Sequence, residues 1–285
     1  MTARFIGFLF WLFLSSTLTH AGNGWSDVAY PLPGLPQVIG SYAAGCIAGA
    51  VPLPLLGDGY QVMRPSRNRY YGHPVLIAFV ERLGRQVAAS GRRLLIGDLG
   101  QPRGGPMPSG HRSHQIGLDV DIWFLELPRG RVLSPLDTEQ LGAPSMIRAA
   151  EGVLDRTLWS LQDRTILKLA SQAPEVERIF VNPIIKQALC ASEMDHAWLT
   201  KIRPWWGHDD HLHIRLACPP DAGQCQPQKP LPSGDGCDAD LARWVEEIRQ
   251  AALSPKPYQK PKPPSTDNLP ATCDAILHSP TAWKR

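Results

Sequence analysis

The sequence predicts an α+β fold, in which a small, mainly antiparallel sheet is flanked by helices and braced by disulfides. Residues 118–123 and 211–216 alternate between apolar and polar side chains, which is typical of strands with one buried face. Apolar residues recur at helical spacing in 73–90, 155–173 and 240–253. The six cysteines are an even number, which favours disulfides in an exported protein.

The first 21 residues have the features of a secretory signal peptide. Arg4 precedes an apolar run, residues 5–14, that is too short to cross a membrane comfortably, and small residues end the segment at Ala21. We expect cleavage after Ala21 and a periplasmic mature protein; a retained membrane anchor is the alternative. No later segment approaches about 18 consecutive apolar residues, so the mature chain is not expected to be an integral membrane protein.

The mature chain is expected to form one domain over residues 22–253, followed by a Pro- and Lys-rich tail, residues 254–285, that Cys273 tethers. One domain is favoured over two because the histidine-rich segments described below must meet, and no Pro/Gly-rich linker separates them. Removal of Arg4 lowers the net charge from +3 to +2, which is too small and too dispersed to predict binding to nucleic acid.

The first half of the chain leads to a glycine-rich loop. Residues 22–54 are punctuated by Pro and Gly and are expected to form extended segments and turns. A helix over 73–90 follows, with Pro74 in its first turn. Residues 93–98 predict a buried strand. The stretch 100–110 cannot form regular structure, and a long loop inside a compact domain indicates a function.

The second half continues the alternation of helices and strands. Residues 155–173 predict a helix and residues 178–181 a short strand, and Asn182-Pro183 predicts the start of another helix. A short amphipathic helix is expected over 240–253. The tail that follows favours extended polyproline geometry and is expected to be largely disordered except near its cysteine.

Five of the nine histidines lie in two short segments, 111–114 and 208–213, and each segment adjoins a strand-like alternation. If the segments meet, His114, Asp121 and His213 offer two nitrogens and one carboxylate oxygen. Three such ligands leave a fourth position for water, which is the pattern of catalytic zinc sites. Either segment alone is more typical of surface histidines, so the prediction rests on the combination.

Further histidines are candidates for the chemistry around that metal. His211 shares a strand face with His213 and is placed to take a proton from an activated water and return it to the leaving amine. His208 is a candidate for orienting the water or stabilising an oxyanion. Trp205 and Trp206 either pack around the strand or line a substrate groove.

These segments closely resemble the penicillin-insensitive murein endopeptidases, which share a wider group with lysostaphin, D-alanyl-D-alanine carboxypeptidases and the hedgehog amino-terminal domain. The pattern of that group is a His, an Asp seven residues later and a distant His-x-His, which here are His114, Asp121 and His211–His213. Further segments of the mature chain also resemble the endopeptidases, namely Gly40–Cys46, Tyr60–Pro74, Leu95–Gly105, Arg178–Cys190, Ile202–Trp206 and Pro232–Cys237.

The resemblance implies roles for individual residues. It implies that His114, Asp121 and His213 bind one catalytic Zn²⁺, with His208 and His211 beside them in the active site. It also implies a substrate, peptidoglycan, and a reaction, hydrolysis of the D-alanyl-diaminopimelyl cross-bridge. The cysteine spacing alone leaves 15 connectivities for six cysteines. The resemblance implies the pairs Cys46–Cys273, Cys190–Cys237 and Cys218–Cys225.

One feature of the family is incomplete in this chain. Members with a second zinc at a subunit contact use the first His of a G-H-x-S-H run together with an Asp and a His further along. His111 is present, but the corresponding residues 147–155 contain no His. A second zinc is therefore not expected, and a homodimer is left open. His111 is an additional candidate ligand or a hydrogen-bonding neighbour of the site.

Together, these observations lead us to interpret residues 22–253 as a zinc metallopeptidase domain that acts as a murein endopeptidase on cross-linked muropeptides. A zinc D,D-carboxypeptidase or amidase of the same group is one alternative. A non-catalytic peptidoglycan-binding protein is the other, although such a protein has no need of the additional His211. An enzyme that uses activated water has no acylating serine, so we expect β-lactams not to inhibit it.

Overall fold

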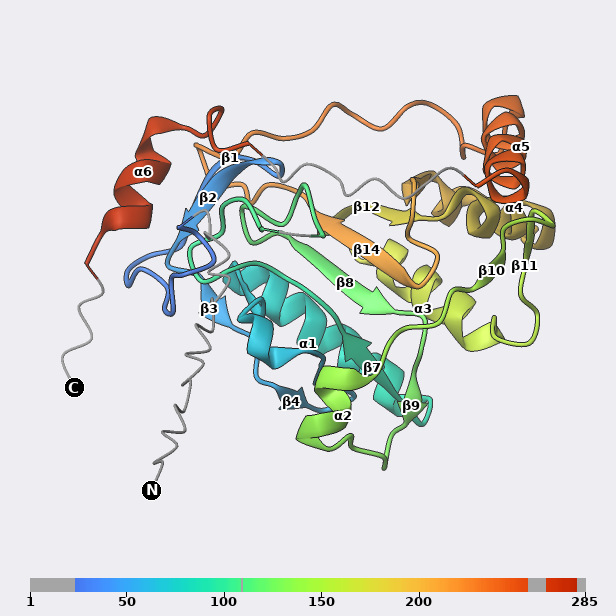
Figure 1. Cartoon of the computed structure of the whole chain (residues 1–285), viewed down its shortest axis with the longest axis horizontal. Coiled ribbons are helices and arrows are strands. Elements are labelled where there is room, and N and C mark those ends of the chain that lie inside the picture. The colour runs from blue at the N-terminus through green and yellow to red at the C-terminus, as the bar shows by residue number, and fades with distance from the viewer. Residues whose placement is uncertain (1–23, 109, 256–264, 281–285) are drawn as a thin grey trace, which may run out of the picture.

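A computed structural model of the chain describes residues 24–108, 110–255 and 265–280 (Figure 1). The expected signal peptide and its cleavage position lie outside the described residues. Within these ranges, no helix is long and apolar enough to cross a membrane.

An eight-stranded sheet forms the centre of the fold. Its strands are β4 (Leu56–Gly57), β5 (Tyr60–Val62), β7 (Arg92–Ile96), β8 (Asp119–Trp123), β9 (Leu127–Pro128), β12 (Val176–Val181), β13 (Ile202–Pro204) and β14 (His211–Leu216). The order is β13-β12-β14-β8-β7-β5-β4, and β9 also pairs with β7. Only the β12–β13 and β5–β7 pairs are parallel. The predicted mainly antiparallel sheet is therefore confirmed.

Short strand pairs and helices surround this sheet. The pairs are β1 (Gln37–Ser41) with β2 (Ala44–Ala48), β3 (Val51–Pro52) with β6 (Tyr71–Gly72), and β10 (Ile147–Arg148) with β11 (Val153–Leu154). The helices are α1 (Pro74–Ala89), α2 (Pro135–Gln140), α3 (Leu161–Gln172), α4 (Pro183–Ser192), α5 (Ala239–Leu253) and α6 (Ala271–His278), with 3-10 turns η1 (Pro65–Arg67) and η2 (Ala197–Lys201). The expected α+β class is confirmed.

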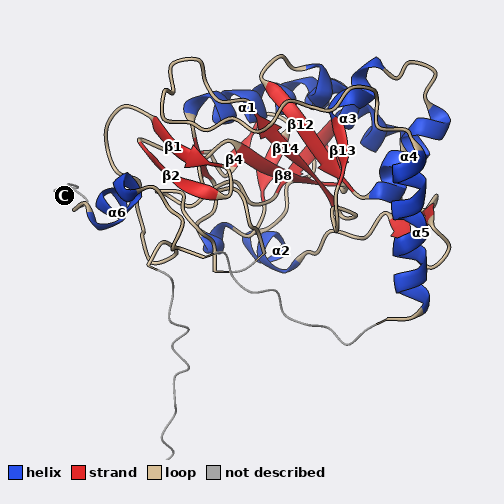
Figure 2. Ribbon diagram, turned by 90° about the horizontal axis from the view of Figure 1, so that it is seen from above, coloured by secondary structure: helices blue, strands red, loops and turns tan. Residues whose placement is uncertain are grey.

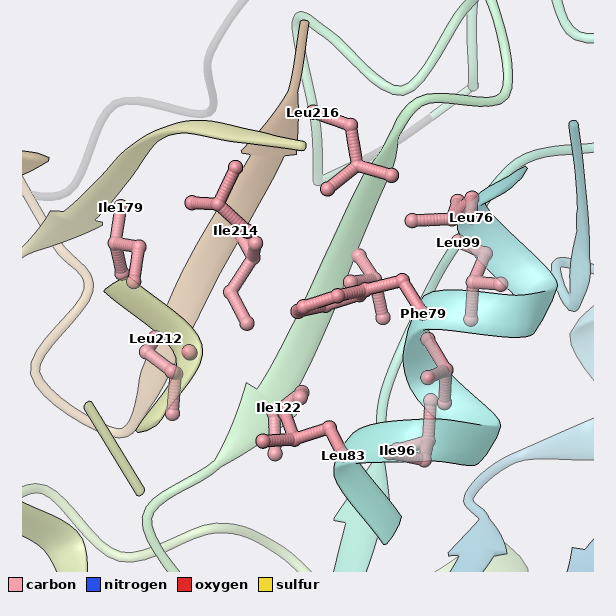
Figure 3. Packing of buried hydrophobic residues seen from close by; sticks show 14 of the residues in the cluster. Leu76, Phe79, Leu83, Ile96, Leu99, Ile122, Ile179, Leu212, Ile214 and Leu216 are labelled. Atoms are coloured by element: carbon pink, nitrogen blue, oxygen red, sulfur yellow. The ribbon is translucent and has the colours of Figure 1, made fainter. Parts of the chain in front are cut away.

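Helices α1 and α3 lie on one face of the sheet (Figure 2). The first begins where the Nδ1 atom of His73 accepts a hydrogen bond from the backbone of Val75, next to the predicted Pro74. Its buried stripe meets the apolar side chains of β8 and β14 (Figure 3). The residues that face one another there are Leu76, Phe79, Leu83, Ile122, Leu212 and Ile214. Because strand side chains alternate, the opposite sheet face is left to the polar residues.

Helix α3 begins six residues later than the pattern of 155–173 predicts. Ser160 forms its N-cap, because its hydroxyl accepts hydrogen bonds from the backbone of Gln162 and Asp163. The Asp163 carboxylate accepts one from the Ser160 backbone in return, which completes a capping box. The predicted pattern began with residues that form a turn around Asp155 instead, where its carboxylate accepts from Thr157.

The tail contains a helix, α6, that the sequence analysis did not predict. Cys273 joins it to β2 through the disulfide with Cys46, and the side chain of Ile276 packs in a small core with Trp25. The guanidinium of Arg103 donates hydrogen bonds to carbonyls at the end of the helix. These contacts order a segment whose composition gives little helical signal.

All three disulfides that the family resemblance implies are present, and the Cα–Cα distances are 5.7, 5.7 and 5.8 Å. Cys218–Cys225 closes a small loop directly after β14, and Cys190–Cys237 ties α4 to the chain before α5. No free cysteine remains in the chain that the structure describes. The expected bracing by disulfides is confirmed.

Candidate metal centre

The polar face of the sheet brings the two predicted half-sites together. In the antiparallel pair of β14 and β8, His213 lies directly opposite Asp121. Arg215 lies opposite Asp119 in the same register, and directly opposed side chains share one face. The period-two pattern predicted from sequence therefore places an imidazole and a carboxylate side by side.

His114 reaches the same face from the loop before β8. Its backbone has φ +66°, and its N–H donates to the Asp119 carboxylate at 2.9 Å. Its ring Nδ1 donates to the carbonyl of Leu99 at 2.6 Å, which leaves Nε2 as the lone-pair nitrogen. Gly117, in the same loop, has φ +70°, and a Cβ there would lie 2.9 Å from the side chain of Ile47. The turn therefore requires glycine.

The ligand atoms converge on one carboxylate oxygen. His114 Nε2 lies 3.4 Å from Asp121 Oδ1, and His213 Nδ1 lies 3.5 Å from the same oxygen. Ligand atoms around a tetrahedral zinc, with bonds near 2.0–2.2 Å, lie about 3.3–3.5 Å apart. His114 is 0% exposed, Asp121 is 3% exposed and His213 is 4% exposed. Neither His114 Nε2 nor Asp121 Oδ1 has a hydrogen-bond partner among the described residues. Buried atoms without partners fit a bound cation.

The charges of the site favour an ionised carboxylate. Burial alone would raise the pKa of Asp121, but the neighbouring imidazoles of His114, His211 and His111 outweigh it and hold that pKa well below its usual value. Asp121 thus carries a negative charge where the lone pairs of His114 and His213 meet. Two nitrogens and one charged oxygen form a donor set that zinc accepts.

His211 and His208 lie next to these three residues. His211 Nε2 is 3.7 Å from Asp121 Oδ1, and its Nδ1 is hydrogen bonded to Asp210. Burial would lower the pKa of His211, but Asp121 and Asp210 raise it to about 9. Burial and the charge of His211 lower the pKa of His208 to about 4. The centroids of the two rings lie 5.0 Å apart. His211 is therefore a candidate acid–base group, and His208 beside it is a neutral ring.

His111 also lies at the site, on the other side of Asp121. Its Nδ1 is 3.4 Å from Asp121 Oδ2, and its Nε2 is 3.0 Å from Asp98 Oδ2. Ligand atoms of His111, His114 and Asp121 all lie within 4.8 Å of one another. The hydrogen-bonding role expected of His111 fits its contact with Asp98, and its role as an additional ligand stays a prediction.

Three acidic residues of the site were missed by the sequence analysis. Asp119 accepts two hydrogen bonds from Arg215, and its Oδ1 lies 3.2 Å from His213 Nε2. Asp98 and Asp210 contact the two outer histidines. A sequence signal existed for Asp119, because it stands two residues before Asp121 on the polar face of the predicted strand. The other two lie at the ends of predicted elements and carry no such signal.

Trp205 and Trp206 are both 53% exposed, so neither is a core residue. The ring of Trp205 contacts Phe180, which also contacts His213. Trp206 contacts Trp244 of α5. Their exposure argues against the packing role considered for these residues, although neither ring lines the pocket beside Asp121 and His211.

A second cluster with metal-ligating residue types lies away from the sheet, at His196, Asp235 and Cys237. It is not a comparable site, because Cys237 is bound in the disulfide with Cys190. His196 is hydrogen bonded through both ring nitrogens, to Asp235 and to the carbonyl of Glu193. No lone pair of its ring is left for a cation.

Comparison with known proteins supports the resemblance seen in the sequence. The sequence model of the penicillin-insensitive murein endopeptidases matches residues 38–278. A protein of that name from Haemophilus influenzae is 46% identical over 261 residues, which is 90% of this chain and 88% of that protein. Another from Escherichia coli strain K12 is 44% identical over 266 residues, 93% of this chain and 94% of that protein.

Proposed function

The chain belongs to the penicillin-insensitive murein endopeptidases, a peptidase family, and on that premise we propose that it is a zinc-dependent enzyme that hydrolyses D-alanyl-diaminopimelyl cross-bridges of peptidoglycan. The observation that carries the zinc proposal is the convergence of His114 Nε2 and His213 Nδ1 on Asp121 Oδ1, at 3.4 and 3.5 Å. Zinc held by these residues supplies an acidified water and a positive charge next to the scissile carbonyl.

The other residues of the site supply the proton transfers. Asp210 fixes one ring nitrogen of His211 and leaves Nε2 directed toward Asp121. We assign His211 as the proton-transfer group: because its pKa is raised to about 9, its neutral fraction takes a proton during attack, and the imidazolium gives that proton to the leaving amine. The Nδ1 atom of His208 is hydrogen bonded to the carbonyl of Trp206. Its Nε2 is therefore available to bind the oxyanion or the attacking water.

The proposed substrate places the protein outside the cytoplasm. The three disulfides fit an oxidising compartment, and the expected signal peptide fits export to the periplasm. In this proposal the partner of the chain is cross-linked peptidoglycan. One zinc per chain is sufficient for the reaction, because three protein ligands and one open position complete a catalytic site.

Mass spectrometry of a purified cross-linked muropeptide dimer tests this proposal. The mature protein is incubated with the dimer, with and without a chelator, and with zinc added back. We expect conversion to two monomers that the chelator abolishes and zinc restores. Loss of a terminal alanine alone would identify a carboxypeptidase instead. Full activity of zinc-free protein in chelator, or an intact dimer with zinc-loaded protein, would contradict the proposal.

A further inference from the structure

Arg64 stands at the edge of the pocket that contains the metal centre. The residues that line this pocket include Arg64, Arg67, Asp98, Asp121, Trp123 and His211. Arg64 follows β5, so it approaches the polar face of the sheet from the side opposite to β14. A peptide bound across this face would therefore have His211 on one side and Arg64 on the other.

The backbone of Arg64 is fixed. Its φ of +52° is uncommon for a residue with a side chain, and its N–H donates to the carbonyl of Thr138 at 2.9 Å. Its carbonyl accepts from the backbone of Arg67 at 3.0 Å. Strained positions of this kind are maintained where the surrounding structure holds them, and they cluster at functional sites.

The guanidinium of Arg64 rests on an aromatic ring. It lies 5.3 Å from the ring centroid of Trp123, which is directly opposite His211 in the β8–β14 pair. A guanidinium that lies over an aromatic ring contacts the ring through the flat face of the guanidinium. The N–H groups at the edge of the guanidinium therefore remain available for hydrogen bonds. Those edges are the groups that bind a carboxylate through two parallel hydrogen bonds.

The other arginines near this pocket already have partners. Arg67 and Arg69 both contact Asp98, at 3.3 and 2.9 Å. The His111 ring shares the same oxygen of Asp98. In contrast, the half-buried guanidinium of Arg64 forms no close ion pair among the described residues, although Asp98, Asp210 and Glu139 act on it from a longer distance. A partly buried arginine whose hydrogen-bonding N–H groups contact no carboxylate is suited to receive one from a ligand.

We propose that Arg64 binds the carboxylate on the substrate residue that supplies the leaving amine, and so sets specificity for a free carboxylate next to the scissile amide. This inference rests on the proposed function, in which that residue is diaminopimelate. In such a cross-bridge, the carbon attached to the scissile nitrogen carries a carboxylate. His211, which returns a proton to that nitrogen, and Arg64 line the same pocket, so one bound residue meets both.

Two substrates and two variants separate this role from a structural one. The substrates are a cross-linked muropeptide dimer and a matched dimer in which the carboxylate beside the scissile amide is a carboxamide. Arg64→Gln removes the charge and keeps a polar side chain at the same backbone position. Arg85→Gln is the control, because Arg85 is exposed on α1, behind the opposite face of the sheet.

We expect wild-type kcat/KM to be about 10- to 100-fold higher for the carboxylate dimer, as for one charged hydrogen-bonded pair. Arg64→Gln loses this preference, because it lowers kcat/KM for the carboxylate dimer much more than for the carboxamide dimer. Arg64→Lys restores part of the preference. An equal loss on both substrates, or an unchanged preference, would overturn the role of Arg64. A wild-type protein that cleaves neither dimer would instead refute the proposed function.

Discussion

Arg215 donates two hydrogen bonds to Asp119, from Nε to Oδ1 at 2.7 Å and from Nη2 to Oδ2 at 3.0 Å. Both residues are almost fully buried, and the guanidinium lies between the rings of Tyr42 and Phe180. Asp119 also holds the backbone of His114. This ion pair therefore supports two of the proposed zinc ligands at once, His114 through its backbone and His213 through a contact of 3.2 Å.

Asp119→Asn is expected to weaken both folding and zinc binding. The change leaves the charge of Arg215 buried without its partner, which costs about 3–5 kcal/mol of unfolding free energy. Loss of support for the ligands lowers zinc affinity about 10- to 100-fold. Urea unfolding and competition with a zinc-binding dye measure the two effects.

The exposed pair of Asp240 and Arg243 gives the matched control. Asp240→Asn breaks an ion pair between side chains that are 79% and 68% exposed, so it is expected to change stability by about 0.5 kcal/mol or less and leave zinc affinity unchanged. Equal effects of the two substitutions would show that burial of the Asp119 pair has no special role.

His211→Ala is expected to keep zinc and lose turnover. The three proposed ligand atoms do not include His211, but its Nε2 lies 3.7 Å from Asp121 Oδ1. Removal of a general acid–base group lowers kcat about 10²- to 10⁴-fold. Asp210→Asn is expected to lower kcat less, because the His211 ring remains and loses only the orientation and the part of its raised pKa that Asp210 supplies.

Zinc content and kcat are measured on the same preparations of these variants. His278→Ala is the control, because His278 is an exposed histidine in α6. A His211→Ala protein that turns over at the wild-type rate would remove this residue from the mechanism. A variant that has lost its zinc would make His211 a ligand instead.

The sequence was sufficient for the parts of the fold that depend on local patterns. The alternation in β8 and β14 identified which face carries Asp121 and His213, and the register of the two strands then joins them. Neither segment alone predicts the register between the two strands, since register depends on long-range packing. For this reason the opposition of Arg215 and Asp119 was not predicted, although both residues stood on the expected face.

Other parts of the site depend on contacts between distant segments. Asp98 becomes part of the site because the loop after β7 folds back and places His111 Nε2 3.0 Å from its carboxylate. Arg64 reaches the pocket because its backbone turns at φ +52°, a conformation that sequence does not predict for arginine. The helix α6 is likewise held by Cys46 and Arg103, which lie far from it in the chain.

The burial of Lys186 is expected to make the stability of the protein depend on pH. It is fully buried in α4, where Nζ donates to the carbonyls of Leu199 and Asp235. Burial and, secondarily, the charge of Arg203 lower its pKa from 10.5 to about 8. Between these values the unfolded chain binds more protons than the folded protein, so stability rises with pH. The expected gain is about 2 kcal/mol between pH 7 and pH 9.5.

Lys186→Met isolates this effect. The variant has no ammonium to titrate at this position. The unfolding free energy of the wild type is therefore expected to rise by about 2 kcal/mol relative to that of the variant between pH 7 and pH 9.5. Urea midpoints at pH 7, 8.5 and 9.5 measure it. A difference that stays constant across this range would show that the lysine keeps an ordinary pKa in the folded protein.

Arg103 connects α6 to the loop that leads to the candidate metal centre. It is 2% exposed, and its Nη1 donates to the carbonyls of Ile276, Leu277 and Ser279 at 2.7–2.9 Å. The last carbonyls of a helix have no partner within the helix, and a cation there is favoured by the helix dipole. Arg103 lies in the loop that leads to His111 and His114, so the end of α6 braces that loop.

Arg103→Met is therefore expected to loosen α6 and destabilise the protein by about 1–3 kcal/mol, as for buried acceptors that lose a charged donor. Hydrogen exchange of residues 271–278 should accelerate, whereas Arg85→Met on α1 should leave it unchanged. The disulfide Cys46–Cys273 still holds the helix in this variant. In a Cys46→Ala, Cys273→Ala background, Arg103→Met should therefore lower the free energy of unfolding by more, because no disulfide then holds the helix. Additive losses would show that the two attachments act independently.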